Sequence, residues 1–206
     1  MKELPDLIRS KPWQWIANIS MSLLWASFAY RHIMGYLEYD QPAFLIYCAS
    51  ETFIAILFLI RNEVQTLSAK ISDWAIALLA TFAGMLLTPS PTILWEGGVW
   101  IVVLATILQF ASVLSLQRSF GIIPANRGVR TGGLYRVVRH PMYLSYMVYY
   151  VGYLLVSASS WNVAIFLVAM TAMLIRLTLE EEHLSSDATY AEYRTRVKWR
   201  LIPFVF

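Results

Sequence analysis

Residues 131–143, with the sequence TGGLYRVVRHPMY, connect a polar segment to an apolar one through Arg139, His140 and Pro141. Proline is favoured in the first turn of a helix, where its missing N–H has no intrahelical partner to lose. We therefore expect a helix to begin at Pro141. A second polar cluster, residues 180–183 (EEEH), stands at the end of the following apolar segment. Two polar clusters joined by an apolar hairpin suggest one site.

The composition predicts a membrane protein. Hydrophobic residues make up 58% of the 206-residue chain and charged residues only 14%, well below the charged content of soluble domains. A helix needs ~20 mostly apolar residues to cross a bilayer. The third and fifth candidate segments are short, so a tilted or partly inserted helix is also compatible with them. We predict an all-α, polytopic membrane bundle of five to six spans at residues 13–30, 42–60, 74–87, 99–116, 142–156 and 161–175.

Lys and Arg residues are distributed unevenly between the two ends of these segments. Of the 16, 15 lie before the first segment, between the second and third, between the fourth and fifth, or from the end of the sixth onward. Only Arg31 lies elsewhere. Because cytoplasmic connections are rich in Lys and Arg, we expect both termini in the cytoplasm. The net charge of +3 then reflects topology and attraction to anionic membrane lipid. No nucleic-acid partner is expected, since no basic aromatic motif is present.

The chain is interpreted as one structural domain with two regions. Residues 1–116 would form N-terminal transmembrane helices, and residues 117–206 a cytosolic region for cofactor binding and catalysis. The connection at residues 117–140 is rich in Gly and Pro, which favours an irregular folded loop, and long loops often carry function. Asp187 is placed to cap a short helix at the membrane surface. Because the connection at residues 157–160 is short, its flanking helices must be antiparallel, with Pro141 and Glu180 at neighbouring ends.

The order of residues in this region resembles the isoprenylcysteine carboxyl methyltransferases and their phospholipid N-methyltransferase relatives. The resemblance covers roughly residues 117–206, and Ser145 departs from it where many relatives have Gly. The residues that carry it are Gly133, Tyr135, Arg139, His140, Pro141 and Tyr143, then Glu180 and Glu181, then Tyr190, Tyr193 and Val197, and finally Pro203 and Phe204.

The resemblance implies an integral membrane methyltransferase that uses S-adenosylmethionine and acts on a lipophilic acceptor. No Gly-rich strand-turn-helix fingerprint is present, so loops and helix ends would have to hold the donor. Arg176 would position a carboxylate acceptor, or Glu180 would orient or deprotonate an amine; the two lie one helical turn apart. Arg139 could bind the carboxylate of the donor because of its charge. The other cofactor contacts are those that the resemblance implies: Leu134, Tyr135, His140, Pro141, Tyr143, Glu181 and Tyr193.

Several alternatives are open at this point. The acceptor could be a prenylated cysteine carboxylate, a phospholipid amine or another hydrophobic small molecule. Outside this class, the chain could be a sterol-reductase-like NADPH enzyme or a non-enzymatic membrane scaffold. Arg139 could simply extend its side chain to lipid headgroups. His140 and Pro141 could have no role other than to begin a helix, and the Glu cluster could be a solvated helix end. Glu51, in the middle of the second apolar segment, could be functional or structural.

No metal is expected, because His32, His140 and His183 have no metal-ligand spacing with each other or with Cys48.

Overall fold

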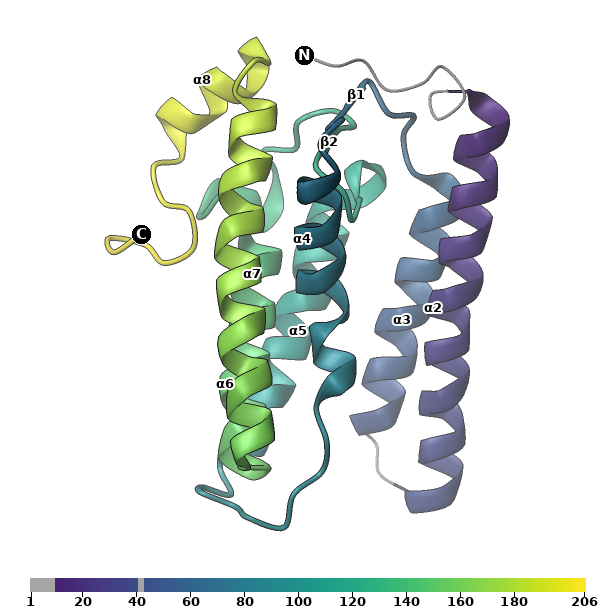
Figure 1. The fold of residues 1–206 in the computed structure, drawn as a ribbon, viewed down its shortest axis with the longest axis vertical. Coiled ribbons are helices and arrows are strands. Elements are labelled where there is room, and N and C mark those ends of the chain that lie inside the picture. Colours follow the sequence, from purple (N-terminus) through teal and green to yellow (C-terminus); the bar gives the residue numbers. More distant parts are fainter. Residues whose placement is uncertain (1–9, 41–42) are drawn as a thin grey trace.

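In the described part of the chain, six long helices follow one another, and each runs in the opposite direction to the one before it (Figure 1). The structure is a computed structural model that describes residues 10–40 and 43–206. Each of the six apolar segments predicted from the sequence corresponds to a helix, so the all-α prediction is confirmed; position 42, the first of the second segment, lies outside the described residues. The helices are α2 (Lys11–Tyr39), α3 (Ala43–Ile60), α4 (Ile71–Phe82) with the 3₁₀ helix η1 (Ala83–Leu86), α5 (Gly98–Leu116), α6 (Pro141–Val156) and α7 (Ser160–Leu184).

Two of these helices are long and apolar enough to cross a membrane by themselves. They are the segments Gly98–Ser119 and Ser160–Leu184, with mean hydropathies of 2.3 and 2.0. Leu45–Ile60 and Ile71–Leu86 are apolar but shorter. The alternating directions are those that a multi-pass protein needs, but five to six spans with cytoplasmic termini stay a prediction.

Two helix ends differ from the sequence prediction. Helix α2 continues past Arg31 to Tyr39, where Asp40 adopts a left-handed conformation (φ 50°) and closes the helix. Helix α7 continues to Leu184, so the Glu cluster belongs to the last two turns of a helix. Hydropathy marks where the apolar run ends, but a helix continues as long as its backbone is hydrogen-bonded and packed.

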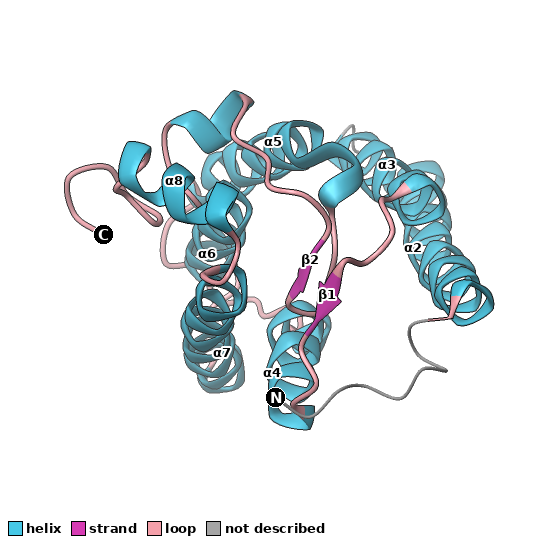
Figure 2. Ribbon diagram, turned by 90° about the horizontal axis from the view of Figure 1, so that it is seen from above, coloured by secondary structure: helices cyan, strands magenta, loops and turns pink. Residues whose placement is uncertain are grey.

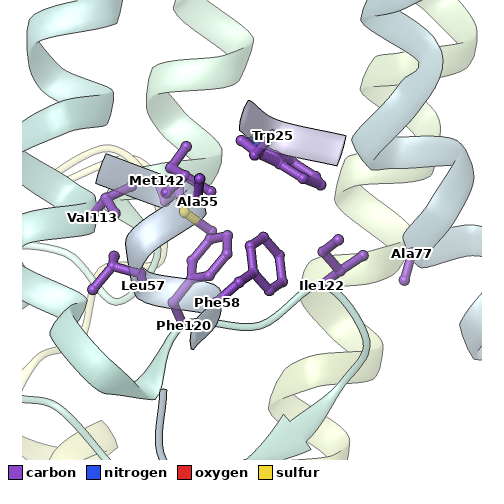
Figure 3. Close-up of a cluster of buried hydrophobic side chains, with 10 residues drawn as sticks. Trp25, Ala55, Leu57, Phe58, Ala77, Val113, Phe120, Ile122 and Met142 are labelled. Atoms are coloured by element: carbon purple, nitrogen blue, oxygen red, sulfur yellow. The ribbon is translucent and has the colours of Figure 1, made fainter. Parts of the chain in front are cut away.

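The helices pack as neighbouring pairs, α2 with α3, α5 with α6, and α4 with α7 (Figure 2). The largest buried cluster lies between them and includes Trp25 of α2, Phe58 of α3 and Met142 of α6 (Figure 3). Two residues of the long loop, Phe120 and Ile122, are inserted into the same cluster, with 3% and 7% of their surface exposed. The loop is therefore anchored in the core of the bundle.

The long loop also forms a two-stranded ladder that the sequence did not predict. Strand β1 (Thr66–Leu67) pairs antiparallel with β2 (Ala125–Asn126), with Thr66 opposite Asn126. Two 3₁₀ turns, η2 (Gln117–Ser119) and η3 (Gly133–Arg136), occupy other parts of the loop. Strands of two residues are too short to show a periodic pattern in the sequence. The ladder connects the long loop to the segment between α3 and α4.

Helix α8 (Ala188–Arg196) begins where the sequence predicted. The Asp187 carboxylate accepts hydrogen bonds from the backbone N–H groups of Thr189 and Tyr190, at 2.7 and 3.2 Å. It also accepts one from the Asn126 side-chain amide at 2.6 Å, which lowers the pKa of this carboxyl below its usual value. A single cap residue therefore joins α8 to β2.

Candidate functional site

The Arg-His-Pro turn is held against the C-terminal tail by backbone hydrogen bonds. The N–H of Arg139 donates to the carbonyl of Trp199 at 2.9 Å, and the N–H of His140 donates to that of Arg200 at 2.8 Å. Pro141 then begins α6, as the sequence predicted. The turn is thus fixed by two backbone hydrogen bonds to a segment about sixty residues later in the chain.

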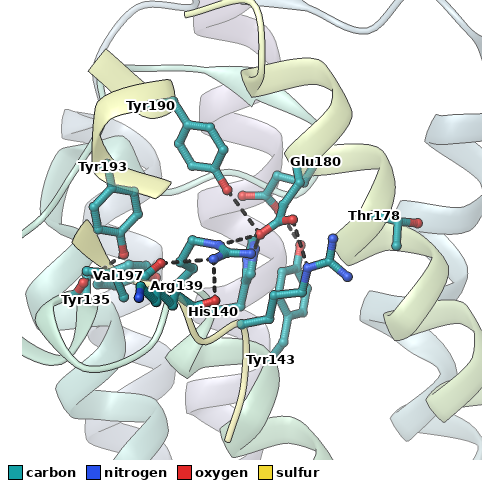
Figure 4. Close-up of polar contacts among 12 residues, drawn as sticks. Tyr135, Arg139, His140, Tyr143, Thr178, Glu180, Tyr190, Tyr193 and Val197 are labelled. Atoms are coloured by element: carbon teal, nitrogen blue, oxygen red, sulfur yellow. Dashed lines mark hydrogen bonds and ion pairs between the residues drawn. The ribbon is translucent and has the colours of Figure 1, made fainter. Parts of the chain in front are cut away.

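Glu181 is the centre of a buried ion cluster, and Figure 4 labels three of its partners, Arg139, His140 and Tyr190. Its Oε1 atom lies 2.6 Å from Nε of Arg139 and 3.1 Å from Nε2 of His140, and its Oε2 atom lies 2.9 Å from Nε of Arg200. The hydroxyl of Tyr190 donates to Oε1 at 3.4 Å. Only 3% of Glu181 is exposed. A buried carboxylate needs such partners, because burial of an unpaired charge is very costly.

Arg139 is occupied by the protein as well. Besides Glu181, its guanidinium donates to the backbone carbonyls of Val197 and Lys198, at 2.9 and 2.7 Å. The cluster therefore fastens the start of α6, the end of α7 and the C-terminal tail to one another. In this structure the Arg139 and Glu181 side chains hold the polar end of the bundle together.

Glu180 points to the other side of this cluster and lines two small adjoining cavities. The hydroxyl of Tyr143 donates a hydrogen bond to its carboxylate. Each cavity has a volume of about 60 Å³. Loop residues, including Ser119 and Ala125, complete the walls. Both cavities are also lined by Leu116, Tyr135, His140 and Glu180.

Three tyrosines close the side of this site that faces α8. Tyr135, Tyr190 and Tyr193 form a buried group, and the hydroxyl of Tyr193 donates to the carbonyl of Tyr135 at 2.7 Å. Burial, followed by the nearby Glu180 carboxylate, raises the pKa of Tyr135 well above its usual value. Burial likewise raises the pKa values of Tyr190 and Tyr193. These phenols therefore stay protonated at neutral pH and act as hydrogen-bond donors.

Arg176 lies one turn before Glu180 in α7, as the sequence predicted, but it lines neither cavity. Its guanidinium donates to the Thr81 hydroxyl of α4 at 2.9 Å and to the carbonyl of Ile122 in the loop. The guanidinium carbon lies 5.1 Å from the centre of the Tyr143 ring. Its buried Nε has no hydrogen-bond partner among the described residues. Arg176 thus stands behind Tyr143 and holds the loop.

The structure brings most of the predicted site residues to one end of the bundle. Tyr135, His140, Tyr143, Glu180 and Tyr193 line one or both cavities, and Arg139 lines one of them. Leu134 does not line either cavity; its backbone N–H donates to the Ser115 hydroxyl at 3.3 Å. Pro141 and Glu181 are buried behind the cavity walls.

Sequence reasoning missed the contribution of the loop. Ser119, Gly121, Ile123 and Ala125 form much of the wall opposite Glu180, and none of them carries chemistry that distinguishes it from other loop residues. The only sequence signal was the length of the connection. Among the described residues, no three His, Cys, Asp or Glu residues are grouped as metal ligands would be.

Comparison with known proteins is consistent with this arrangement. The model of a family described as phospholipid methyltransferase matches residues 92–191, a range that begins before α5 and ends within α8. This range contains the Arg-His-Pro turn, the Glu cluster, and the residues of α6 and α7 that line the two cavities. No curated protein shows significant similarity to the chain. The match covers 100 of the 206 residues and supports the resemblance of the sequence motif to this group of membrane methyltransferases.

Proposed function

We propose that this protein is an S-adenosylmethionine-dependent methyltransferase that acts on a lipophilic acceptor reached from the membrane. The family match supports methyl transfer at a membrane. The observation that carries the proposal is that Tyr135, His140 and Glu180 line both cavities, and Tyr143 lines one of them. These residues come from the loop and from the facing ends of α6 and α7.

The chemistry of the cavity walls fits the donor. S-adenosylmethionine supplies an electrophilic methyl group on a sulfonium, and it also carries an ammonium and a carboxylate. The Glu180 carboxylate and the phenols of Tyr135 and Tyr193 are suitable partners for cationic and polar groups. The backbone at the start of α6 suits a carboxylate, because a helix N-terminus attracts anions.

The volume of the cavities requires a movement. Each measures about 60 Å³, whereas small-molecule sites begin at ~300 Å³. We infer that the part of the loop at residues 125–130, which lies beyond its anchor in the core, separates from helix α8 to admit the donor. The polar contact between Asn126 and Asp187 and the two-residue ladder are the weak links that such an opening would break. Closure afterwards would exclude water and align the reacting groups, which is the main source of rate in a displacement reaction.

Glu180 is the proposed catalytic residue for an amine acceptor. The methyl carbon forms a bond to nitrogen as its bond to sulfur breaks, and one proton must leave the nitrogen. The Glu180 carboxylate lines both cavities and can accept that proton, while the Tyr143 hydroxyl fixes its orientation. Arg176, Leu134, Pro141, Arg139 and Glu181 are proposed to hold this arrangement in place rather than to face the acceptor.

An amine acceptor is favoured over a prenylated cysteine carboxylate by the placement of these charges. A carboxylate acceptor needs a cation that is free to face it, but the Arg176 guanidinium is directed to Thr81 and Ile122. The arginines that line the second cavity are engaged as well, Arg139 by Glu181, Arg127 by the Asn62 carbonyl and Arg130 by the Ser119 hydroxyl. An amine needs a carboxylate there, and Glu180 is that group. A carboxylate acceptor remains the second candidate, since the Nε of Arg176 has no partner and rotation of this side chain would free it.

Two measurements test the proposal. The purified protein is titrated with S-adenosylmethionine and, separately, with NADPH; binding of the first alone is expected. It is then incubated with radiolabelled methyl donor and extracted native lipids and proteins, and label in an amine-bearing lipid is expected. Binding of NADPH instead would point to a reductase, and binding of neither would point to a scaffold. Label in a base-labile methyl ester would instead identify the acceptor as a carboxylate.

A further inference from the structure

A further cavity lies at the same end of the bundle as the polar cluster, and all of its lining residues except Arg118 lie outside the range of the family match. It has a volume of about 630 Å³ and lies where α2 begins and α3 ends, beside η2. Three cationic residues line it, Lys11, Arg61 and Arg118, against one carboxylate, that of Glu63. The remaining lining residues are Gln14, Trp15, Asn18, Leu59, Ile60 and Asn62.

The arginines of this cavity have no carboxylate of their own. Nε of Arg61 donates to the Asn18 side-chain oxygen at 2.7 Å, and Nε of Arg118 donates to the carbonyl of Ile60 at 2.6 Å. Across residues 10–40 and 43–206, no carboxylate lies within ion-pair distance of either guanidinium. Glu63 instead pairs with Lys11 at 3.5 Å, and both of those side chains are about three quarters exposed. The neutral hydrogen bonds orient the two guanidiniums without cancelling their charge.

A further cation behind the wall increases the positive potential. Arg127 is buried and hydrogen-bonded to Asn62, which is part of the cavity lining: the Arg127 guanidinium donates to the Asn62 carbonyl, and the Asn62 amide donates to the Arg127 carbonyl. Burial, followed by the charge of Arg127, lowers the pKa of Arg61 to about 9. Arg61 is partly buried and held by Asn18, whereas Arg118 is exposed at the wall of the same cavity. A partly buried guanidinium without a carboxylate partner, next to a second arginine, favours an anion as the ligand of this cavity.

The rim of the cavity is apolar and faces outward from the bundle. Trp15 is 56% exposed, and Leu59 and Ile60 are 40% and 47% exposed. Tryptophan is enriched at the membrane–water boundary, and exposed leucine and isoleucine at the end of an apolar helix suit contact with acyl chains. A ligand with an anionic head and an apolar tail would satisfy both parts of the site.

We infer that the cavity formed by Lys11, Arg61 and Arg118 between α2, α3 and η2 binds the phosphate of a phosphate-bearing molecule, and that its apolar rim selects an anionic phospholipid. Arginine is suited to this task because its planar guanidinium matches phosphate oxygens in pairs. Basic pockets between helices on the cytoplasmic side are known to hold such headgroups. This site is separate from the methyl-transfer cavities and does not depend on the proposed function.

Binding of dioctanoyl phosphatidic acid to the detergent-solubilised full chain tests the inference, with dioctanoyl phosphatidylcholine and glycerol 3-phosphate as comparison ligands. Phosphatidic acid is expected to bind at least tenfold more tightly than phosphatidylcholine. The double variant Arg61→Gln/Arg118→Gln is expected to lose at least tenfold in affinity. The matched control is Arg194→Gln/Arg196→Gln, which removes two exposed charges of α8 and is expected to bind as the unmodified protein does.

A second variant guards against misfolding. Glu63 is exposed, so Glu63→Gln leaves the fold intact, removes the only carboxylate of the cavity and should tighten phosphatidic acid binding severalfold. Glycerol 3-phosphate separates the two sources of phosphate: weaker binding than the lipid supports a lipid site, and equal binding supports a site for a soluble phosphate ester. Affinity unchanged in both the arginine and the Glu63 variants would overturn the inference.

Discussion

Replacement of Glu181 by Gln should destabilise the protein more than any other single change of one charge at this end of the bundle. The substitution keeps the shape of the side chain and removes its charge. Arg139, which is 7% exposed, and the neighbouring His140 and Arg200 would then have no carboxylate partner. Removal of one member of a buried ion pair costs ~3–5 kcal/mol, because the remaining charge is buried and unpaired.

This cost can be expressed as a shift in melting temperature. In a chain of this size, 1 kcal/mol corresponds to ~2–4 °C, so the apparent unfolding midpoint in detergent should fall by roughly 6–20 °C. Size-exclusion chromatography after heating, with tryptophan fluorescence as the signal, measures the midpoint. The C-terminal tail should also become accessible to carboxypeptidase, since Arg200 is one of the residues that Glu181 holds.

Glu182→Gln is the matched control. The Glu182 side chain is 72% exposed, and its one ion pair, with Lys70, is at 3.9 Å, which is worth ~0–1 kcal/mol. Its midpoint should move by no more than about 4 °C. The double variant Arg139→Gln/Glu181→Gln should lose less than the sum of the two single variants, because it leaves no unpaired charge between them. Equal midpoints for the Glu181 and Glu182 variants would refute the reasoning.

Three other changes test separate parts of the account. Glu180→Gln should lower turnover with an amine acceptor ~100-fold with little change in melting temperature, and turnover equal to that of Glu182→Gln in the radiolabel assay would remove Glu180 from catalysis. Arg176→Ala should loosen the loop, because Thr81 and Ile122 lose their donor; faster amide exchange at residues 119–125 is expected, whereas a loss of turnover with unchanged exchange would instead favour direct contact with the acceptor. Asn162→Leu should cost ~2–3 kcal/mol, since this fully buried amide bonds to Thr88 twice and to Ser157 once; a midpoint unchanged by this variant would mean that the far end of the bundle is held by other contacts.

Much of the fold was visible in the sequence because it depends on composition and local chemistry. Long apolar segments predicted the helices, Pro141 marked the start of α6, and Asp187 marked the start of α8. The short connection before Ser160 required antiparallel helices, which brought the start of α6 close to Glu180. These inferences rest on chain geometry, which needs no knowledge of distant contacts.

The role of individual site residues was harder to predict, because it depends on which partner each side chain meets. Adjacent glutamates look equivalent in the sequence, yet Glu181 faces Arg139 and Arg200 while Glu180 faces Tyr143 and the cavities. Successive residues of a helix point about 100° apart, so the two carboxylates had to differ. Which of them would meet the arginines was decided by the C-terminal tail, whose position no local pattern determines.

The cavity of Arg61 and Arg118 was invisible for the same reason. Arg61 follows α3 and Arg118 lies in η2, and in the sequence each counted only as one of the basic residues that predict topology. Their approach to Asn18 and Ile60, and the burial of Arg127 behind Asn62, follow from how the long loop is folded. The count of Lys and Arg residues therefore predicted that Arg61 and Arg118 lie at the same end of the bundle, but it did not predict that they share a cavity.

Ultraviolet cross-linking of radiolabelled S-adenosylmethionine to the purified protein, followed by peptide mapping, tests the central claim most directly. The account predicts label in two regions, the loop and start of α6 at residues 117–143 and the end of α7 and α8 at residues 180–193, with loss of label on addition of unlabelled S-adenosylhomocysteine. Label confined to the cavity between α2 and α3, or label that the competitor does not displace, would contradict it.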